Sequence, residues 1–211
     1  NPVARILADK RIITMANHTL LVDRNGRDRP IEDSAAPIMT ENGELTGVVL
    51  VFRDFTDKKK NHAAIEYLSF HDHLTGLYNR RFYEEELARL DTARNWPLTI
   101  VMGDVNGLKL INDSFGHASG DLLLQKTAAA LSRGCRSDDI LARIGGDEFV
   151  MLLPQTTARE AAQLIKRIKK ILATQTVAGL EISVAFGAAT KSAASTDINT
   201  VFRQAEDMMY H

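Results

Sequence analysis

The chain has 211 residues, with 26 Lys or Arg against 27 Asp or Glu, and its formal net charge is −1. Apolar residues make up 45% of it, which is typical of a globular protein and excludes disordered and collagen-like chains. The near-neutral balance argues against broad binding to nucleic acid, whose backbone attracts an excess of cations. Cys135 is the only cysteine, so no internal disulfide can form. We therefore expect a protein of a reducing compartment, the cytoplasm.

No apolar run approaches the roughly 18 residues that a membrane helix needs. The sequence starts with Asn1-Pro2-Val3 rather than with a charged stretch followed by an apolar one, so no signal peptide is expected. We expect no membrane segment in this chain, and whether residues upstream of it anchor a longer protein stays open.

Residues 1–57 have the composition of a small antiparallel sheet. Strands are predicted at 17–23, 29–40 and 45–55, because turn-forming residues that include Gly26 and Gly43 separate these stretches. Three lysines then open the segment 58–71, whose apolar residues follow a helical spacing. This segment is predicted to be a helical linker between two domains.

The third part of the chain, 72–211, alternates helices and strands. Helices are predicted at 79–94, 121–133, 157–172 and 197–210, and strands at 97–103, 139–144, 149–153 and 181–189. Gly134 is predicted to end the second helix. From residue 97 onward the order is β-α-β-β-α-β-α. It predicts an α/β (α+β) fold with a ferredoxin-like βαββαβ core, in which helices flank a central antiparallel sheet.

Acidic residues mark two places in this core. Asp104 follows the buried strand 97–103, and Asp147 and Glu148 follow Gly145-Gly146 at the tip of a predicted hairpin. Glycine permits a positive φ and lets a ligand approach the backbone closely. In a ferredoxin-like sheet the first strand neighbours the hairpin, so the three carboxylates are expected to meet. Their repulsion predicts a divalent cation, Mg²⁺ or Mn²⁺, although each acid taken alone is compatible with an ordinary turn.

The polar segment 106–121 is predicted to connect two elements. Lys109 could neutralise a phosphate, while Asn112 and Asp121 could read a base edge. An Asp accepts hydrogen bonds from the paired N–H donors of guanine better than from adenine. The alternatives are that Asp121 caps a helix and that His117 is a structural histidine.

Three motifs together resemble the GGDEF family of diguanylate cyclases. They are Asp72–Arg81 (DHLTGLYNRR), Asp104–Asp121 (DVNGLKLINDSFGHASGD) and Arg143–Phe149 (RIGGDEF). The resemblance covers about residues 70–211. Residues 1–57 resemble the C-terminal part of a PAS sensory domain, in the stretch 29–38 and in Asp54-Phe55-Thr56. The ligand of that PAS part is unknown.

The resemblance implies that two molecules of GTP condense to cyclic di-GMP and two pyrophosphates, with one GTP held by each domain of a homodimer. It implies Mg²⁺ (or Mn²⁺) ligands at Asp104, Asp147 and the carbonyl of Val105, and deprotonation of the attacking hydroxyl by Asp147 or Glu148. The substrate-binding set that it implies consists of Asn112 and Asp121 for guanine, Lys109, Gly107 and Leu108 for phosphates, and His117, Gly145 and Gly146.

Arg136 and Asp139 lie where the family has its product-inhibition site, so the resemblance implies that they bind cyclic di-GMP. A surface ion pair is the alternative for this Arg-x-x-Asp spacing. The sequence departs from the family pattern at Asn106, where a second Asp is usual, and at Gly107-Leu108, where aromatic residues are usual. The Lys and Arg that usually follow the last helix are not in this sequence, so a truncated C-terminus is expected.

Two other functions stay open beside an active, PAS-regulated cyclase. One is a receptor that binds cyclic di-GMP through Arg136 and Asp139. The other is a dimeric signalling scaffold. The intact acidic residues of the hairpin favour the cyclase.

Overall fold

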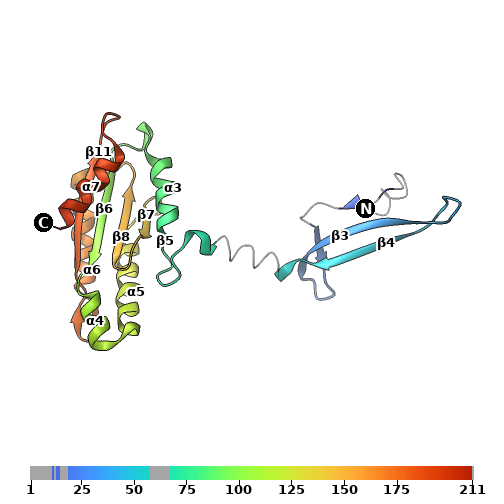
Figure 1. Cartoon of the computed structure of the whole chain (residues 1–211), viewed down its shortest axis with the longest axis horizontal. Coiled ribbons are helices and arrows are strands. Elements are labelled where there is room, and N and C mark those ends of the chain that lie inside the picture. Colours follow the sequence, from blue (N-terminus) through green and yellow to red (C-terminus); the bar gives the residue numbers. More distant parts are fainter. Residues whose placement is uncertain (1–10, 12, 15–18, 58–66, 211) are drawn as a thin grey trace. The chain divides into compact units, whose positions relative to one another are not determined.

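The structure, a computed structural model, describes residue 11 and residues 13–14, 19–57 and 67–210 (Figure 1). The chain divides into two compact units between Tyr67 and Leu68. Most of the predicted linker helix, residues 58–66, lies outside the described residues. Residues 67–70 at its end are helical.

The first unit is an antiparallel sheet in which one long strand pairs with all the others. Its strands are β1 (Ile13–Thr14), β2 (Thr19–Val22), β3 (Asp28–Met39) and β4 (Leu45–Asp54). Between β2 and β3, the Asp23 carboxylate accepts hydrogen bonds from the backbone of Asn25 and Arg27, and Gly26 takes a φ of 75°. Gly43 takes a φ of 78° in the turn between β3 and β4. Both turns therefore form where glycine was expected to permit them.

The second unit is built on a five-stranded sheet with the order β11-β6-β8-β7-β5. Its strands are β5 (Tyr78–Asn79), β6 (Leu98–Val105), β7 (Ile140–Arg143), β8 (Glu148–Leu153) and β11 (Val184–Lys191). All neighbours are antiparallel except β5 and β7, which are parallel. The order of the first four is the one that a ferredoxin-like βαββαβ chain produces, so the predicted fold is confirmed.

Helices cover both faces of this sheet (Figure 1). They are α3 (Arg80–Leu90), α4 (Leu108–Phe115), α5 (His117–Gly134), α6 (Ala158–Leu172) and α7 (Ile198–Met209), with a short 3₁₀ turn η1 (Ala93–Asn95). Alternate residues of β6 point to opposite faces. Ile100 and Met102 pack with α3 and α7, whereas Val101 and Val105 pack with α4, α5 and α6. The strand is buried on both sides, as its continuous apolar run predicts.

Two parts of the fold differ from the prediction. The segment expected as a polar connection contains α4, and α5 begins at His117 rather than at Asp121. Ile111 is the only buried residue of α4 and Leu108 packs against the core beside it, while Gly107 and Gly116 bound the helix with φ values of 77° and 82°. A small hairpin of β9 (Thr176–Val177) and β10 (Leu180–Glu181) also precedes β11.

Gly134 ends α5, but not for the reason that we expected. Its φ is not in the left-handed region, and Cys135 is the C-cap. A Cβ atom at Gly134 would lie 2.4 Å from Cγ1 of Ile168. The glycine is therefore required by the close packing of α5 against α6.

Candidate active site

Two of the predicted carboxylates lie opposite each other on neighbouring strands. Asp104 near the end of β6 is the register partner of Glu148 at the start of β8. Asp104 alternates with Ile100 and Met102, so its side chain is on the face of α3 and α7, and Glu148 is on the same face because it alternates with Val150. The prediction that the strand and the hairpin bring these residues together is confirmed.

Asp147 lies next to this pair. Its backbone carbonyl accepts a 3.0 Å hydrogen bond from the N–H of Val105, the residue that follows Asp104. Burial, and after it the negative charge of Asp147, raise the pKa of Asp104. The two carboxylates therefore repel each other, and a cation between them would relieve that repulsion.

The carboxylates that could hold a metal ion are the pair Asp104 and Asp147. The part of the chain that the structure describes contains no group of three or more His, Cys, Asp or Glu residues arranged to hold a metal ion. The ligand set that the sequence implies has only these two carboxylates and the carbonyl of Val105, and it stays a prediction. Mg²⁺ is commonly held by one or two carboxylates and completed by water and substrate phosphates, so this pair fits it.

The glycines of the hairpin allow close contacts and do not adopt a left-handed turn conformation. Neither Gly145 nor Gly146 has a positive φ, contrary to the role that we expected. A Cβ atom at Gly145 would lie 2.3 Å from Oε2 of Glu148, so this carboxylate folds over the glycine. Nothing would lie within 4 Å of a Cβ at Gly146, so a ligand can approach the backbone there.

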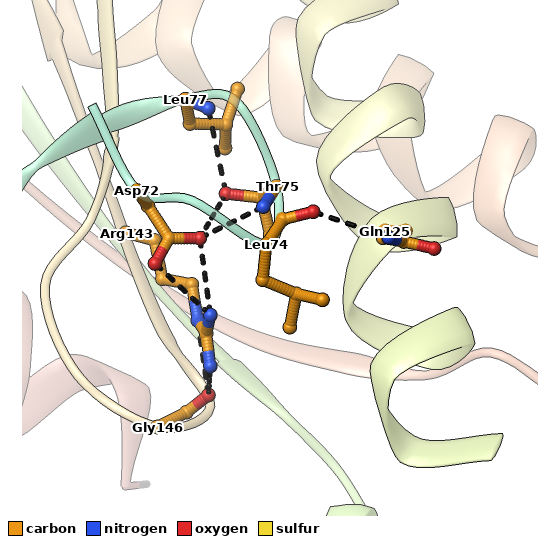
Figure 2. A network of polar contacts seen from close by, with 7 residues as sticks. All are labelled: Asp72, Leu74, Thr75, Leu77, Gln125, Arg143 and Gly146. Carbon is orange, nitrogen blue, oxygen red and sulfur yellow. Dashed lines mark hydrogen bonds and ion pairs between the residues drawn. The ribbon is translucent and has the colours of Figure 1, made fainter. Parts of the chain in front are cut away.

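An ion-pair clamp holds the hairpin in place (Figure 2). Arg143 donates to the carbonyl of Gly146 from Nη2 at 2.7 Å, and its Nη1 lies 3.1 Å from Oδ1 of Asp72. Asp72 also accepts from the backbone and the hydroxyl of Thr75, at 2.9 and 2.6 Å. Burial raises the pKa of Asp72, but these hydrogen bonds lower it by more, so the pKa lies below its ordinary value.

The clamp also connects to α5, because Gln125 donates to the carbonyl of Leu74 at 3.2 Å (Figure 2). Sequence reasoning assigned no role to Asp72 or Arg143. Their opposite charges in two separate motifs were the signal that could have identified the pair.

The two residues expected to read guanine come from neighbouring helices. Asn112 lies on α4 and Asp121 on α5. A Cβ atom at Gly120 would lie 2.0 Å from Oδ1 of Asn112, so the amide packs directly against α5 beside Asp121. Asp121 is exposed inside α5, whose N-cap is Gly116, so the interpretation of Asp121 as a helix cap is wrong.

The start of α4 is open to an anion. Gly107 is its N-cap and supplies no side-chain hydrogen bond, so the first N–H groups of the helix, beginning at Leu108, have no cap from a side chain. Lys109 is exposed in the first turn. This helix end follows Val105 by two residues, which puts an N-terminus of the kind that binds anions next to the carboxylates. His117, the first residue of α5, is exposed.

Arg136 and Asp139 form a loop between α5 and β7. The N–H of Arg136 donates to Oδ2 of Asp139 at 2.7 Å, and burial raises the pKa of Asp139. Their side chains, both of which the structure describes, do not form an ion pair within 4 Å, but the positive charge of Arg136 still acts against the rise in the pKa of Asp139. A cavity of about 290 Å³ adjoins both residues, and Leu77 and Tyr78 also line it.

The fold and the paired carboxylates define a nucleotidyl-cyclase-type α/β domain. Residues 69–211 match the family described as "Diguanylate cyclase, GGDEF domain", and the chain belongs to this family. Residues 1–60 match the PAS fold. Among the helices of the described residues, none has the length and apolarity needed to cross a bilayer.

Curated relatives carry the names of two opposite activities. The chain is 36% identical over 166 residues to "Probable diguanylate cyclase DgcE" of Escherichia coli K12, which covers 76% of this chain and 15% of that protein. It is 36% identical over 170 residues to "Cyclic di-GMP phosphodiesterase PdeB" of Shewanella oneidensis, and the match covers 76% of this chain and 20% of that protein. Diguanylate cyclase DgcM of E. coli K12 is 31% identical over 192 residues, and the match covers 88% of this chain and 46% of that protein. The chain thus spans less than half of the length of these relatives.

Solved structures share the fold. Diguanylate cyclase SiaD of Pseudomonas aeruginosa, in complex with its activator SiaC, has a TM-score of 0.62 at 29% identity, covering 74% of this chain and 62% of that one. The GGDEF domain of TpbB (YfiN) from the same organism has a TM-score of 0.58 at 30% identity, covering 66% and 86%.

Proposed function

We propose that the second unit is a diguanylate cyclase that condenses two GTP into cyclic di-GMP and two pyrophosphates. The observation that carries this proposal is the juxtaposition of Asp104 and Asp147 with the uncapped start of α4. Carboxylates beside an anion-binding helix end suit a metal-assisted reaction of a phosphate chain. The family of the chain supports the same chemistry.

Each side chain then has a distinct task. Asn112 and Asp121 bind the guanine edge, where the carboxylate accepts from the ring N–H and the amino group. The start of α4 and Lys109 bind the phosphates. Asp104 and Asp147 would hold Mg²⁺, whose charge offsets that of the phosphates and makes the attacking hydroxyl more acidic.

The reaction forms and breaks one P–O bond for each linkage. The 3′-oxygen of one GTP attacks the α-phosphorus of the other, and the bond from that phosphorus to pyrophosphate breaks. The hydroxyl proton passes to Asp147 or Glu148, both of which lie at the strand ends beside Asp104. One domain binds one GTP, so catalysis takes two copies facing each other in a homodimer. The PAS unit regulates how the two domains meet.

Product analysis by chromatography and mass spectrometry, with GTP and Mg²⁺ at rising protein concentration, tests this function. We expect cyclic di-GMP to form with a steeper than linear dependence on protein. Asp147→Asn is expected to form none, whereas Asp113→Asn, which removes an exposed carboxylate from α4, is expected to match the unmodified protein. Turnover that survives Asp147→Asn would contradict the proposal.

The cavity beside Arg136 and Asp139 favours a second candidate function, binding of cyclic di-GMP as inhibitor or as signal. A guanidinium beside a cavity suits a phosphate or a guanine edge. Calorimetry with cyclic di-GMP and Asp147→Asn separates this function from catalysis. Binding that persists in this variant and disappears in Arg136→Ala would support it. Product formation without any such binding would contradict it.

A further inference from the structure

Helix α7 is held unusually close to the strand at the edge of the sheet. A Cβ atom at Gly187 of β11 would lie 2.0 Å from the carbonyl oxygen of Ala205 and 2.4 Å from the backbone nitrogen of Met209. The backbone of α7 therefore rests directly on the backbone of β11. This contact fixes where the end of the helix lies relative to the strand.

The end of α7 lies at the carboxylate end of the sheet. Gly187 pairs with Met102, and two residues back along β11, Ala185 pairs with Asp104. Two residues of strand span roughly 7 Å. Tyr210, which follows the last turn of α7 as its C-cap, therefore lies near the level of Asp104, on the face of the sheet that Asp104 and Glu148 share.

The electrostatics agree with this placement. Partial desolvation, followed by the negative charges of Glu148, Asp104, Glu206 and Asp147, raise the pKa of Tyr210. The phenol is thus within electrostatic range of all three site acids and stays a neutral donor. Its side chain is 67% exposed, and its hydroxyl forms no hydrogen bond within the part of the chain that the structure describes.

The position of the base indicates which part of a nucleotide would meet this hydroxyl. Asn112 and Asp121 belong to α4 and α5, which cover the opposite face of the sheet from α7. A nucleotide whose base lies on their side can reach Tyr210 only with its phosphate chain, across the end of the sheet. A neutral donor among carboxylates also suits a phosphate oxygen, because an ionised phenol would repel it.

We infer that the Tyr210 hydroxyl donates a hydrogen bond to a phosphate oxygen of the GTP bound by the same domain. This inference rests on the proposed function, because it takes GTP to be the ligand of the carboxylate site. Tyr210 is then a binding residue for the phosphate chain, contributed by the last helix.

Direct binding without turnover tests the inference. The probe is 3′-deoxy-GTP with Mg²⁺, which lacks the attacking hydroxyl and cannot condense, and guanosine serves as the probe without phosphates. Tyr210→Phe removes only the hydroxyl. We expect it to weaken 3′-deoxy-GTP about tenfold, the loss of one hydrogen bond to a charged group, and to leave guanosine binding unchanged.

Tyr83→Phe is the matched control, because it removes a phenol hydroxyl that is buried in the core without a partner among the described residues. It is expected to bind both probes as the unmodified protein does. Unchanged binding of 3′-deoxy-GTP by Tyr210→Phe, or an equal loss for guanosine, would overturn the inference alone. An unmodified protein that does not bind 3′-deoxy-GTP would overturn the proposed function and this inference with it.

Discussion

The clamp of Asp72 and Arg143 is expected to contribute strongly to the stability of the second unit. Their side chains are only 16% and 13% exposed. An exposed ion pair contributes about 0–1 kcal/mol, whereas removal of one partner from a buried pair costs about 3–5 kcal/mol. Asp72→Ala leaves the guanidinium mostly buried, with the Gly146 carbonyl as its remaining partner. We therefore expect a loss of about 3 kcal/mol, at the lower end of the range for buried pairs.

Urea unfolding at pH 7 measures this loss, because Trp96 is the only tryptophan and its fluorescence reports the second unit. A double-mutant cycle with Arg143→Ala should give a coupling energy of at least about 1 kcal/mol. A loss below about 0.5 kcal/mol, or additive single effects, would refute the reasoning.

The pH dependence gives a second check on the same pair. The pKa of Asp72 is lowered from 3.8 in the folded chain, so the unfolded chain takes up its proton first as the pH falls. The stabilisation from its ionised form is therefore complete above about pH 5 and is lost progressively as the pH falls through 3.8 and then through the lower pKa of the folded chain. The difference in unfolding free energy between the unmodified protein and Asp72→Asn should shrink as the pH falls below 4. A difference that stays constant would show that the charge of Asp72 is not what stabilises the clamp.

Three further changes have expected outcomes that thermal and urea unfolding can check. Asp104→Asn should raise the thermal midpoint at pH 7 without divalent cations, because the raised pKa of Asp104 means that its ionisation costs stability as the pH rises. The gain should vanish at pH 3, where the carboxyl group is protonated in both states. A lowered midpoint at pH 7 would contradict this prediction. Gly187→Ala should cost about 3 kcal/mol, because the new methyl group would meet backbone atoms of α7, and a cost below 1 kcal/mol would contradict that packing. Asp91→Asn should lower the free energy of unfolding by about 3 kcal/mol, because Lys191, which is 4% exposed, would lose the carboxylate 2.7 Å from its Nζ. An unchanged urea midpoint would contradict this prediction.

The fold could be predicted because its core elements have clear hydrophobic periods. Strand β6 is apolar on both faces, and α6 has apolar residues repeated along one side. The sequence therefore predicts both elements close to their observed bounds. Helix α4 was missed because it has only eight residues and lies between two glycines. Its two flanking glycines with positive φ were visible in the sequence, but they indicate turns as readily as helix ends.

The site was predicted in part for a related reason. A carboxylate at a strand end and a hairpin that returns beside it follow from topology, so Asp104 and Glu148 could be placed together. The direction of a side chain does not follow from topology. The fold of Glu148 over Gly145, and the reach of Arg143 back to Asp72, depend on rotamers and on contacts between distant segments.

Close contacts at three glycines help to fix how these side chains and the last helix are placed. Gly120 accommodates Oδ1 of Asn112, Gly145 accommodates Oε2 of Glu148, and Gly187 accommodates the backbone of α7. Each glycine therefore leaves room for a different part of the site: the amide that we propose binds the base, a carboxylate, and the helix that ends in the phenol. An alanine at each position would displace one of these parts while the others stay in place. Separate effects of the three substitutions on base choice, turnover and phosphate binding would follow from this arrangement, because each contact involves a different segment of the chain.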